Sequence, residues 1–488
     1  MSPDVPAPDV PHVDVLIVGA GLSGIGAAAQ LTREVPERTY LILESRASIG
    51  GTWDLFTYPG VRSDSDMFTL GYRFRPWQGE KALADGPSIL TYVRETARDY
   101  SVEDHIRYGH RVVRAEWSSQ DRRWTVTAQH EGGQSRFTCS LLWSCAGYYS
   151  YESGYAPDFP GQESFTGPIV HPQAWPADLD YAGRRVVVIG SGATAVTLVP
   201  AMAATATKVT MLQRSPTYVM SLPSVDRVAN IARRLLPQRA AYVVIRWKNI
   251  LMSRLLYRVS QKRPNVVRKL IRKDNVAHLP RGYDVDTHFN PTYGPWDQRL
   301  CLVPDADLFE AIASGRAEVV TDTVATFTPT GIDLASGRHL DADIIVTATG
   351  LTLEAFGGAE VLIDGAPVDL PSTMGYKALM LSGVPNFVFT VGYTNASWTL
   401  KADLVAEFVV RVLRHLRETG TRVFVPMRDP SVGETPFMDF EAGYVLRAID
   451  QLPKQGDRAP WRLDQDYLRD IVTIRRGKLD DGVLMFSD

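Results

Sequence analysis

Two glycine-rich loops hold the residues of this sequence best suited to bind a charged cofactor. Both follow the pattern Gly-x-Gly-x-x-(Gly/Ala), with Gly19, Gly21 and Gly24 in the first loop and Gly190, Gly192 and Ala195 in the second. The first glycine permits a tight turn, the second lets the backbone approach a pyrophosphate, and the third allows a helix to pack closely on a strand. The free N–H groups at the start of that helix favour an anion. We therefore predict two dinucleotide-binding loops in one chain.

The residues around the first loop fit a nucleotide whose ribose hydroxyls are free. Ser23 lies in the loop and can add a hydroxyl group to the phosphate contacts. Glu44 follows twenty positions after Gly24, at the expected end of the next strand. A carboxylate at that place accepts hydrogen bonds from ribose hydroxyls, so we predict that Glu44 holds the ribose.

The second loop has a basic rather than an acidic residue at the equivalent place. Its next strand ends in Gln213, Arg214 and Ser215. An acid there would repel a ribose 2′-phosphate, whereas Arg214 can pair with it and Ser215 can donate to it. This loop is therefore predicted to prefer NADPH over NADH. The remaining loop residues that would contact this nucleotide are Ser191, Ala193 and Thr194.

One nucleotide site with an acid and one suited to NADPH are typical of a flavoprotein that takes hydride from NADPH. These residues alone leave reductase and oxygenase chemistry both open. A further motif lies between the two loops, with the spacing F-x-G-x-x-x-H-x-x-x-W-P. It consists of Phe165, Gly167, His171, Trp175 and Pro176.

The segments around the loops predict an α/β fold with two Rossmann-like dinucleotide-binding domains and a helical insertion. Apolar runs at 15–18 and 39–45 read as strands on either side of a helix, and the pattern repeats from Arg184. Third strands are expected at 141–147 and 342–350. We predict a mobile N-terminal arm at 1–12, one discontinuous domain at 13–150 and 345–488, and a second domain at 151–344.

The composition fits a globular protein of the cytoplasm. The chain has 488 residues, is 45% hydrophobic and carries a net charge of −3. No window approaches the roughly 18 consecutive apolar residues of a spanning helix, and the N-terminus lacks the features of a signal peptide. Cys139, Cys145 and Cys301 form neither a disulfide framework nor a zinc motif, so we expect no metal site. Nothing indicates a nucleic-acid partner.

The expected helical insertion, at about 225–290, is strongly cationic. Residues 231–273 contain thirteen Lys or Arg and no Asp or Glu. At helical spacing, Val244, Trp247, Leu251 and Leu255 share one stripe. The favoured interpretation places this stripe on the core and the charges in solvent. Peripheral membrane contact and homo-oligomer formation stay open as alternatives.

The motif between the loops resembles the fingerprint of class B flavin monooxygenases of the Baeyer–Villiger type. Its Trp-Pro ending is the Baeyer–Villiger form, whereas related N- and S-oxygenating enzymes carry Tyr or Phe followed by Lys or Arg. The resemblance extends to "GGTWDLFTYPGVRSDSDMFTLGYRFRPW", "PWDQRLCLVPDADLF" and "GYTNASWTLKADL", and covers nearly the whole chain beyond the N-terminal arm.

The resemblance implies an enzyme with FAD in the first domain and NADPH in the second. It would use O2 to convert small lipophilic ketones into esters or lactones through a C4a-peroxyflavin, and would also oxidise sulfides or thioamides. A heteroatom oxygenase with little ketone activity is the main alternative. A disulfide reductase is disfavoured because 24–138 contains no cysteine. A non-catalytic nucleotide-binding protein is the third class.

The resemblance also implies roles for particular residues. Arg299 would be the active-site cation that stabilises the developing oxyanion, and Asp64 would orient it. Gln298 stands where many family members have a lysine for the 2′-phosphate, so NADPH selectivity would rest on Arg214 and Ser215. His171 and Trp175 would couple domain rotation to the cycle and transfer no proton. Residues expected at FAD are Thr52, Trp53, Asp54, Leu55, Asp64 and, through its backbone, Val112; Arg62 and Ser63 are expected at NADP.

Overall fold

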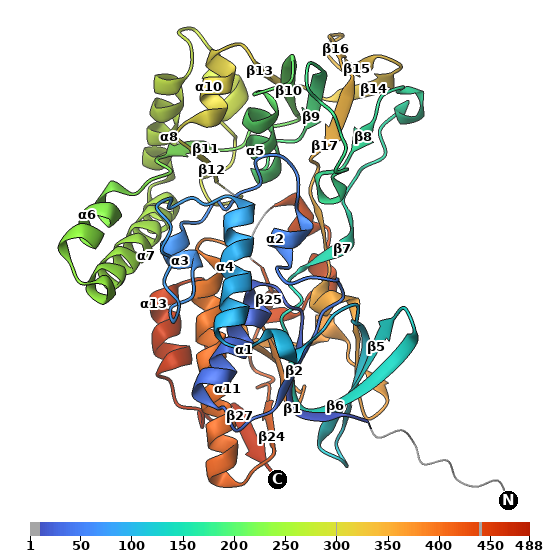
Figure 1. Ribbon diagram of the computed structural model, residues 1–488, viewed down its shortest axis with the longest axis vertical. Helices are drawn as coiled ribbons and strands as arrows, with labels where there is room; N and C mark the ends of the chain where they lie inside the picture. Colours follow the sequence, from blue (N-terminus) through green and yellow to red (C-terminus); the bar gives the residue numbers. More distant parts are fainter. Residues whose placement is uncertain (1–9, 299, 439–441) are drawn as a thin grey trace, which may run out of the picture.

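Each glycine loop follows an inner strand of its own β-sheet. The computed structural model describes residues 10–298, 300–438 and 442–488. In Figure 1 the first sheet and helices α1 (Leu22–Glu34) and α11 (Trp398–Thr419) occupy the lower part of the molecule, and the second sheet occupies the upper part. Most of the predicted N-terminal arm, 1–9, lies outside the described residues.

The first sheet takes strands from both ends of the chain. Its order is β20-β19-β4-β5-β6-β1-β2-β3, with β23 also paired to β6. Strand β23 lies parallel to β6, and Trp143 of β6 donates its indole N–H to the Thr390 hydroxyl at 2.9 Å. The strands are β1 (His12–Val18), β2 (Tyr40–Leu43), β3 (Ile106–Arg107), β4 (Arg111–Ser118), β5 (Arg123–His130), β6 (Gly133–Ser144), β19 (Glu360–Ile363), β20 (Ala366–Pro367) and β23 (Phe387–Phe389).

Alternation along β1 explains how this sheet is covered on both faces. Successive side chains of a strand point to opposite faces. Val15 and Ile17 pack with α1 and α11 in one core, whereas Leu16 packs with Trp124 and Phe387 in another. All five side chains are at most 1% exposed. The apolar run that predicted the strand is thus buried on two sides.

The second sheet is parallel and has the order β13-β10-β9-β17-β8. Val188 of β9 packs with α5 (Ala193–Met202) and α10 (Asp307–Ala313), and Val187 packs on the opposite face with Phe327. The strands are β8 (Ile169–Val170), β9 (Arg185–Ile189), β10 (Lys208–Gln213), β13 (Ala317–Thr321) and β17 (Ile344–Thr347). A three-stranded sheet, β14 (Val324–Thr328), β15 (Gly331–Leu334) and β16 (His339–Asp341), covers that opposite face.

Pairing between strands far apart in the sequence indicates where the domain boundaries lie. Strands β19 and β23, which follow residue 345, belong to the first sheet, and β18 (Leu351–Leu353) pairs with β7 (Tyr149–Gly154) between the two sheets. These pairings favour the predicted division into 13–150 with 345–488 and 151–344. We propose it with the second boundary moved past Thr347, because all of β17 belongs to the second sheet.

Shorter elements complete the described fold. The helices are α2 (Thr52–Leu55), α3 (Met67–Leu70), α4 (Gly86–Asp99), α12 (Gly443–Leu446) and α13 (Tyr467–Asp470). The remaining strand pairs are β11 (Val219–Leu222) with β12 (Cys301–Pro304), β21 (Gly375–Tyr376) with β22 (Met380–Leu381), β24 (Val423–Pro426) with β27 (Leu484–Ser487), and β25 (Glu434–Pro436) with β26 (Lys454–Gly456). Among the described residues, no helix has both the length and the apolarity needed to cross a membrane.

The segment expected to be a helical insertion contains four helices. They are α6 (Arg227–Leu235), α7 (Gln238–Lys262), α8 (Pro264–His278) and α9 (Val285–Phe289), and α6 and α7 stand at the left edge of Figure 1. The favoured interpretation of the apolar stripe is wrong. Val244, Trp247, Leu251 and Leu255 are between 40% and 57% exposed.

The buried side of α7 explains why the stripe points outward. Ala241, Ile245, Arg246 and Ile250 are the buried residues near the middle of this helix. At about 100° per residue, Arg246 lies roughly opposite Leu251 and Leu255. The apolar pattern misleads because Arg246, which has buried partners, takes an inner position together with Ala241, Ile245 and Ile250.

Candidate active site

Residues of both glycine-loop units line one cavity of about 670 Å³. The first unit contributes Gly21 and Thr52, and α5 of the second unit contributes Ala193. Met252 of α7 and Trp398 at the start of α11 complete the wall from two other directions. This volume lies in the range of sites that hold cofactors and drug-sized ligands. The cavity is therefore the place where two nucleotide sites could exchange a reacting group.

The first glycine loop has the geometry that its spacing predicts. Gly19 has φ of +100°, and a Cβ there would lie 2.8 Å from the carbonyl oxygen of Cys145. A Cβ on Gly24 would lie 1.9 Å from the Gly19 carbonyl oxygen, so only glycine allows α1 to pack this closely. Gly21 is the N-cap of α1 and supplies no side-chain bond to the first turn. The N–H groups of that turn are thus available to a phosphate, which fits a dinucleotide.

Glu44 is buried beneath this loop and holds its backbone. Its Oε2 accepts a hydrogen bond from the Ala20 N–H at 2.7 Å, and its Oε1 accepts one from the Arg46 N–H at 2.8 Å. A carboxylate can accept about four hydrogen bonds, so capacity for ribose hydroxyls remains. Ser23, in the first turn of α1, accepts the indole N–H of Trp398 at 2.7 Å.

The second loop has the same geometry, and the basic residue that follows its next strand, Arg214, is exposed to solvent. Gly190 has φ of +139°, and α5 begins after Gly192, again without a side-chain cap. Ser191 shares a hydrogen bond with the Thr217 hydroxyl at 2.8 Å. Arg214 is exposed at the end of β10, and within the described residues it forms no ion pair. Ser215 beside it is also exposed, while Thr194 is half-buried and Ala195 is buried in the first turn of α5.

The segment 62–64 reaches the cavity, but its arginine is already paired. Arg62, Ser63 and Asp64 all line the cavity. The Arg62 guanidinium binds both carboxylate oxygens of Asp307, with Nη2 3.3 Å from Oδ1. Burial raises the pKa of Asp307 more than Arg62 lowers it. Arg299 lies outside the described residues, so its predicted contact with Asp64 stays a prediction.

The structure divides the residues expected at FAD into two groups. Thr52 and Trp53 line the cavity. Asp54 lies behind it, with ion pairs to Arg46 at 2.8 Å and Arg94 at 3.2 Å. Burial alone would raise the pKa of Asp54, but bonds from Ser48 and the two arginines outweigh it and lower that pKa. Leu55 and Val112 pack in the core on one face of the first sheet, outside the cavity lining.

Aromatic residues outside the glycine loops and the fingerprint form part of the wall. Tyr148 stacks on Trp398, with ring centroids 5.3 Å apart, and both line the cavity. Tyr149 and Thr52 share a hydroxyl–hydroxyl hydrogen bond, which joins β7 to the turn at α2. The only sequence signals were the tyrosines after the strand at 141–147 and the stretch "GYTNASW".

The fingerprint residues pack on the second sheet, and His171 reaches the place where the chain passes between the two sheets, which we term the crossing. His171 Nδ1 accepts the Gln173 N–H at 3.2 Å, so Nε2 carries the proton and donates to the Gly350 carbonyl at 3.2 Å. Burial lowers the pKa of His171 more than this bond raises it, which keeps the ring neutral. Trp175 packs against the core around α5, and Phe165 is buried in the core on the other face of the second sheet.

Two further fingerprint positions are fixed by their neighbours. A Cβ on Gly167 would lie 2.3 Å from the Asp343 carbonyl oxygen, so a glycine is required for this approach. Pro176 follows Trp175 and accepts the Leu179 N–H at 3.3 Å through its carbonyl. The segment 165–176 is thus packed against the second sheet and reaches the crossing through His171.

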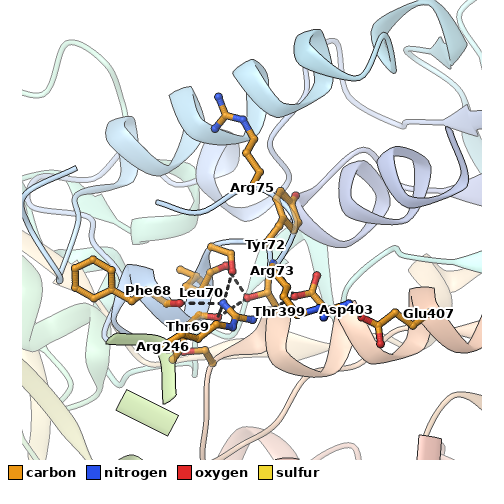
Figure 2. Close-up of polar contacts among 12 residues, drawn as sticks. Phe68, Thr69, Leu70, Tyr72, Arg73, Arg75, Arg246, Thr399, Asp403 and Glu407 are labelled. Atoms are coloured by element: carbon orange, nitrogen blue, oxygen red, sulfur yellow. Dashed lines mark hydrogen bonds and ion pairs between the residues drawn. The ribbon is translucent and has the colours of Figure 1, made fainter. Parts of the chain in front are cut away.

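A buried arginine joins α7 to the floor of the cavity (Figure 2). Arg246 donates to the carbonyl oxygens of Phe68 at 2.9 Å and Gly71 at 2.8 Å, and pairs with Asp403 at 3.2 Å. The hydroxyl of Thr399 lies 2.6 Å from the carbonyl oxygen of Leu70 and 2.9 Å from that of Thr69, and shares its one proton between them. These bonds satisfy the carbonyl groups that the end of α3 leaves without helical partners. Burial raises the pKa of Asp403 to about 6, although Arg246 acts in the opposite direction.

The described part of the chain contains no group of three or more His, Cys, Asp or Glu side chains that could hold a metal ion. Cys139, Cys145 and Cys301 are buried and form no disulfide bond. Cys145 and Cys301 line the cavity, and burial raises the pKa of Cys145 to about 12. A thiol with so high a pKa is a poor nucleophile at neutral pH.

Sequence comparisons place the chain among flavin-dependent oxygenases. Residues 83–361 match the family described as flavin-binding monooxygenase-like, and residues 17–75 match an NAD(P)-binding Rossmann-like domain. The chain is 58% identical over 478 residues to the FAD-containing monooxygenase EthA of Mycobacterium tuberculosis, with 98% of both chains covered. It is 47% identical over 481 residues to the probable FAD-binding monooxygenase AlmA of Acinetobacter baylyi, covering 98% of this chain and 96% of that protein.

Solved structures show the same fold. An oxidized steroid monooxygenase bound to NADP superposes with a TM-score of 0.72 at 23% identity, covering 85% of this chain and 88% of that chain. An open structure of cyclohexanone monooxygenase superposes with a TM-score of 0.72 at 18% identity, covering 86% and 90%. The predicted α/β fold with Rossmann-like domains is confirmed.

Proposed function

Because this chain belongs to the flavin-binding monooxygenase-like family, we propose that it converts ketones into esters or lactones, with NADPH as reductant and O2 as oxidant. The prediction that the protein is a flavoprotein monooxygenase is confirmed, and FAD and NADP are its cofactors. Bound FAD would accept hydride from NADPH and activate O2. In sum, ketone, NADPH, H⁺ and O2 give ester, NADP⁺ and water.

The shared cavity is the observation that carries this proposal. Gly21 of the first loop and Ala193 at the start of α5 both line it, so groups held by the two loops would meet in one volume. The wall contributed by Trp53, Tyr148 and Trp398 is aromatic and would exclude water from the reacting atoms. Such a site suits a lipophilic substrate.

Arg299 is proposed to act on the substrate, with Asp64 as its positioning residue. Trp296 and Leu300, three residues before and one residue after Arg299 in the chain, both line the cavity. A guanidinium there would stabilise the oxyanion that forms when the ketone carbonyl is attacked. Asp64, also in the lining, would orient it. Arg214 and Ser215 are proposed to bind the 2′-phosphate of NADPH, and His171 and Trp175 to couple the two domains.

Product analysis with labelled oxygen tests the proposal. The FAD-loaded enzyme is supplied with NADPH, ¹⁸O2 and either a linear aliphatic ketone or an alkyl aryl sulfide. We expect an ester that carries one ¹⁸O atom. The Arg299→Ala variant should still oxidise NADPH when oxygen is absent, because hydride transfer does not need this cation, but should form no ester.

Two results would change the assignment. Labelled sulfoxide without any ester would assign the enzyme to heteroatom oxygenation. Quantitative hydrogen peroxide without any oxygenated product would contradict monooxygenase activity toward both substrate classes.

A further inference from the structure

Helix α7 presents an apolar surface that nothing in the described residues covers. Val244, Trp247, Leu251 and Leu255 form what we term the outer face of α7 and are at least 40% exposed. The opposite side of the helix is held down by the buried bonds of Arg246 (Figure 2). A contiguous exposed apolar face on a well-anchored helix indicates an interaction surface.

Helix α6, which packs on α7, also has exposed apolar side chains. Its Ala229 and Ala232 pack with Ala241 and Ile245 of α7 in one small core. Its remaining apolar side chains therefore turn away from that core. Ile231 is 56% exposed and Leu235 is 76% exposed.

The charges that the two helices of this surface carry are of one sign, since α6 and α7 contain Arg and Lys but no Asp or Glu. Some of the basic residues of 231–273 pair inside the molecule, as Lys248 does with Asp226 and Arg254 does with Asp466. Others are exposed, and within 10–298, 300–438 and 442–488 they form no ion pair. These unpaired cations are Arg234, Arg239, Lys262, Arg263, Lys269 and Lys273. Apolar side chains flanked by unpaired cations complement a surface that is apolar inside and anionic outside, as a bilayer with anionic headgroups is.

The cavity opens at the same surface. Met252 is 59% exposed and also lines the cavity, so it lies at an opening. It directly follows Leu251 of the outer face. Leu256, next to Leu255, is half-buried and lines the cavity as well. An apolar molecule could pass from this face into the cavity without crossing bulk water.

We propose that the outer faces of α6 and α7 dock on an anionic lipid bilayer and that lipophilic substrate enters the cavity from the membrane. The docking is independent of the reaction, whereas the entry of substrate rests on the proposed function. A second copy of the chain is the competing occupant of the face, but like charges on the two copies would repel each other.

Co-sedimentation with vesicles tests the docking. The FAD-loaded protein is mixed with vesicles of phosphatidylcholine, with or without phosphatidylglycerol. We expect binding to the anionic vesicles that weakens at high salt. The double variant Leu251→Asp, Leu255→Asp should lose at least about tenfold in vesicle affinity, since two leucines no longer leave water. Arg234→Gln with Arg239→Gln should weaken binding at low salt only.

The control places a charge on an unrelated exposed residue. Met427 is 53% exposed, and Met427→Asp should leave vesicle affinity unchanged. Equal binding of all variants, or no binding to anionic vesicles, would overturn the proposal. So would a wild-type oligomer, seen by sedimentation velocity without lipid, that the leucine variant converts to a monomer while vesicles bind neither form.

Turnover separates the two parts of the inference. The leucine variant should oxidise a short, water-soluble ketone at the wild-type rate, because neither leucine lines the cavity. It should oxidise a long-chain ketone embedded in anionic vesicles at least about tenfold more slowly than wild type. Equal rates on the embedded ketone would refute entry from the membrane. Absence of turnover in every variant would contradict the proposed function and leave the vesicle result standing.

Discussion

Replacement of Arg246 by methionine tests how α7 is held to the rest of the molecule. The variant Arg246→Met retains a long apolar side chain, so the helix and much of its packing are preserved. It removes the ion pair to Asp403 and the hydrogen bonds to the carbonyls of Phe68 and Gly71. The side chains of Arg246 and Asp403 are only 5% and 7% exposed, so water cannot replace the lost guanidinium.

The expected loss follows from that burial. Removing one partner of a buried ion pair costs about 3–5 kcal/mol, because the other charge stays behind in an apolar setting. Asp403 keeps the hydrogen bond from the Arg73 N–H at 2.9 Å and can take up a proton, since its pKa is already about 6. Protonation caps the loss near the lower end of that range. For a cooperative unit of domain size, this corresponds to a fall in Tm on the order of 10 °C.

Thermal unfolding of four proteins measures the effect. They are wild type, Arg246→Met, Asp403→Asn and the double variant, each loaded with FAD. We expect the double variant to lose less stability than the sum of the two single variants, because it leaves no unpaired charge. Arg239→Met is the matched control, since Arg239 is exposed on the same helix. A fall of less than about 2 °C for Arg246→Met, or additive losses, would refute the anchoring role.

Two more predictions concern the second glycine unit and the crossing between the sheets. Arg214→Ala should raise the KM for NADPH at least about tenfold and leave the KM for NADH nearly unchanged, because only NADPH carries the 2′-phosphate; a parallel rise for both would contradict the phosphate role. Stability should fall as pH drops below about 6.5, because the pKa of His171 is lowered in the folded chain and only the unfolded chain then gains the proton. His171→Asn should therefore lose more Tm relative to wild type at pH 8 than at pH 5, and an equal loss at both would show that His171 does not titrate in this way.

The parts of the fold that could be predicted are those encoded by local spacing. Gly19 and Gly24 require glycine because backbone atoms of the same loop or the adjoining strand approach within 3 Å of the missing Cβ. Such contacts leave a fixed spacing in the sequence. The strands that lead into the loops contain the uninterrupted apolar runs 15–18 and 186–189 because both faces of each sheet are covered, and these runs are equally visible in the sequence.

The parts that could not be predicted depend on partners far along the chain. Arg246 faces inward because Asp403, 157 positions later, and the carbonyls at the end of α3 receive it. No periodicity of α7 contains that information, so the apolar stripe was placed on the wrong side. Trp398 enters the cavity wall through a bond to Ser23, 375 positions away.

The pairing of β23 with β6 sets an order of events during synthesis. Trp143 must wait for Thr390, which leaves the ribosome 247 positions later. At about 5–20 residues per second, this takes roughly 12–50 s. Meanwhile residues 151–347 supply all strands of the second, parallel sheet, so this sheet can fold. The first sheet, still without α11 over one face, exposes Val15 and Ile17 during this interval. We therefore expect nascent chains stalled before Phe387 to bind chaperones and to be degraded faster than those stalled after Thr419.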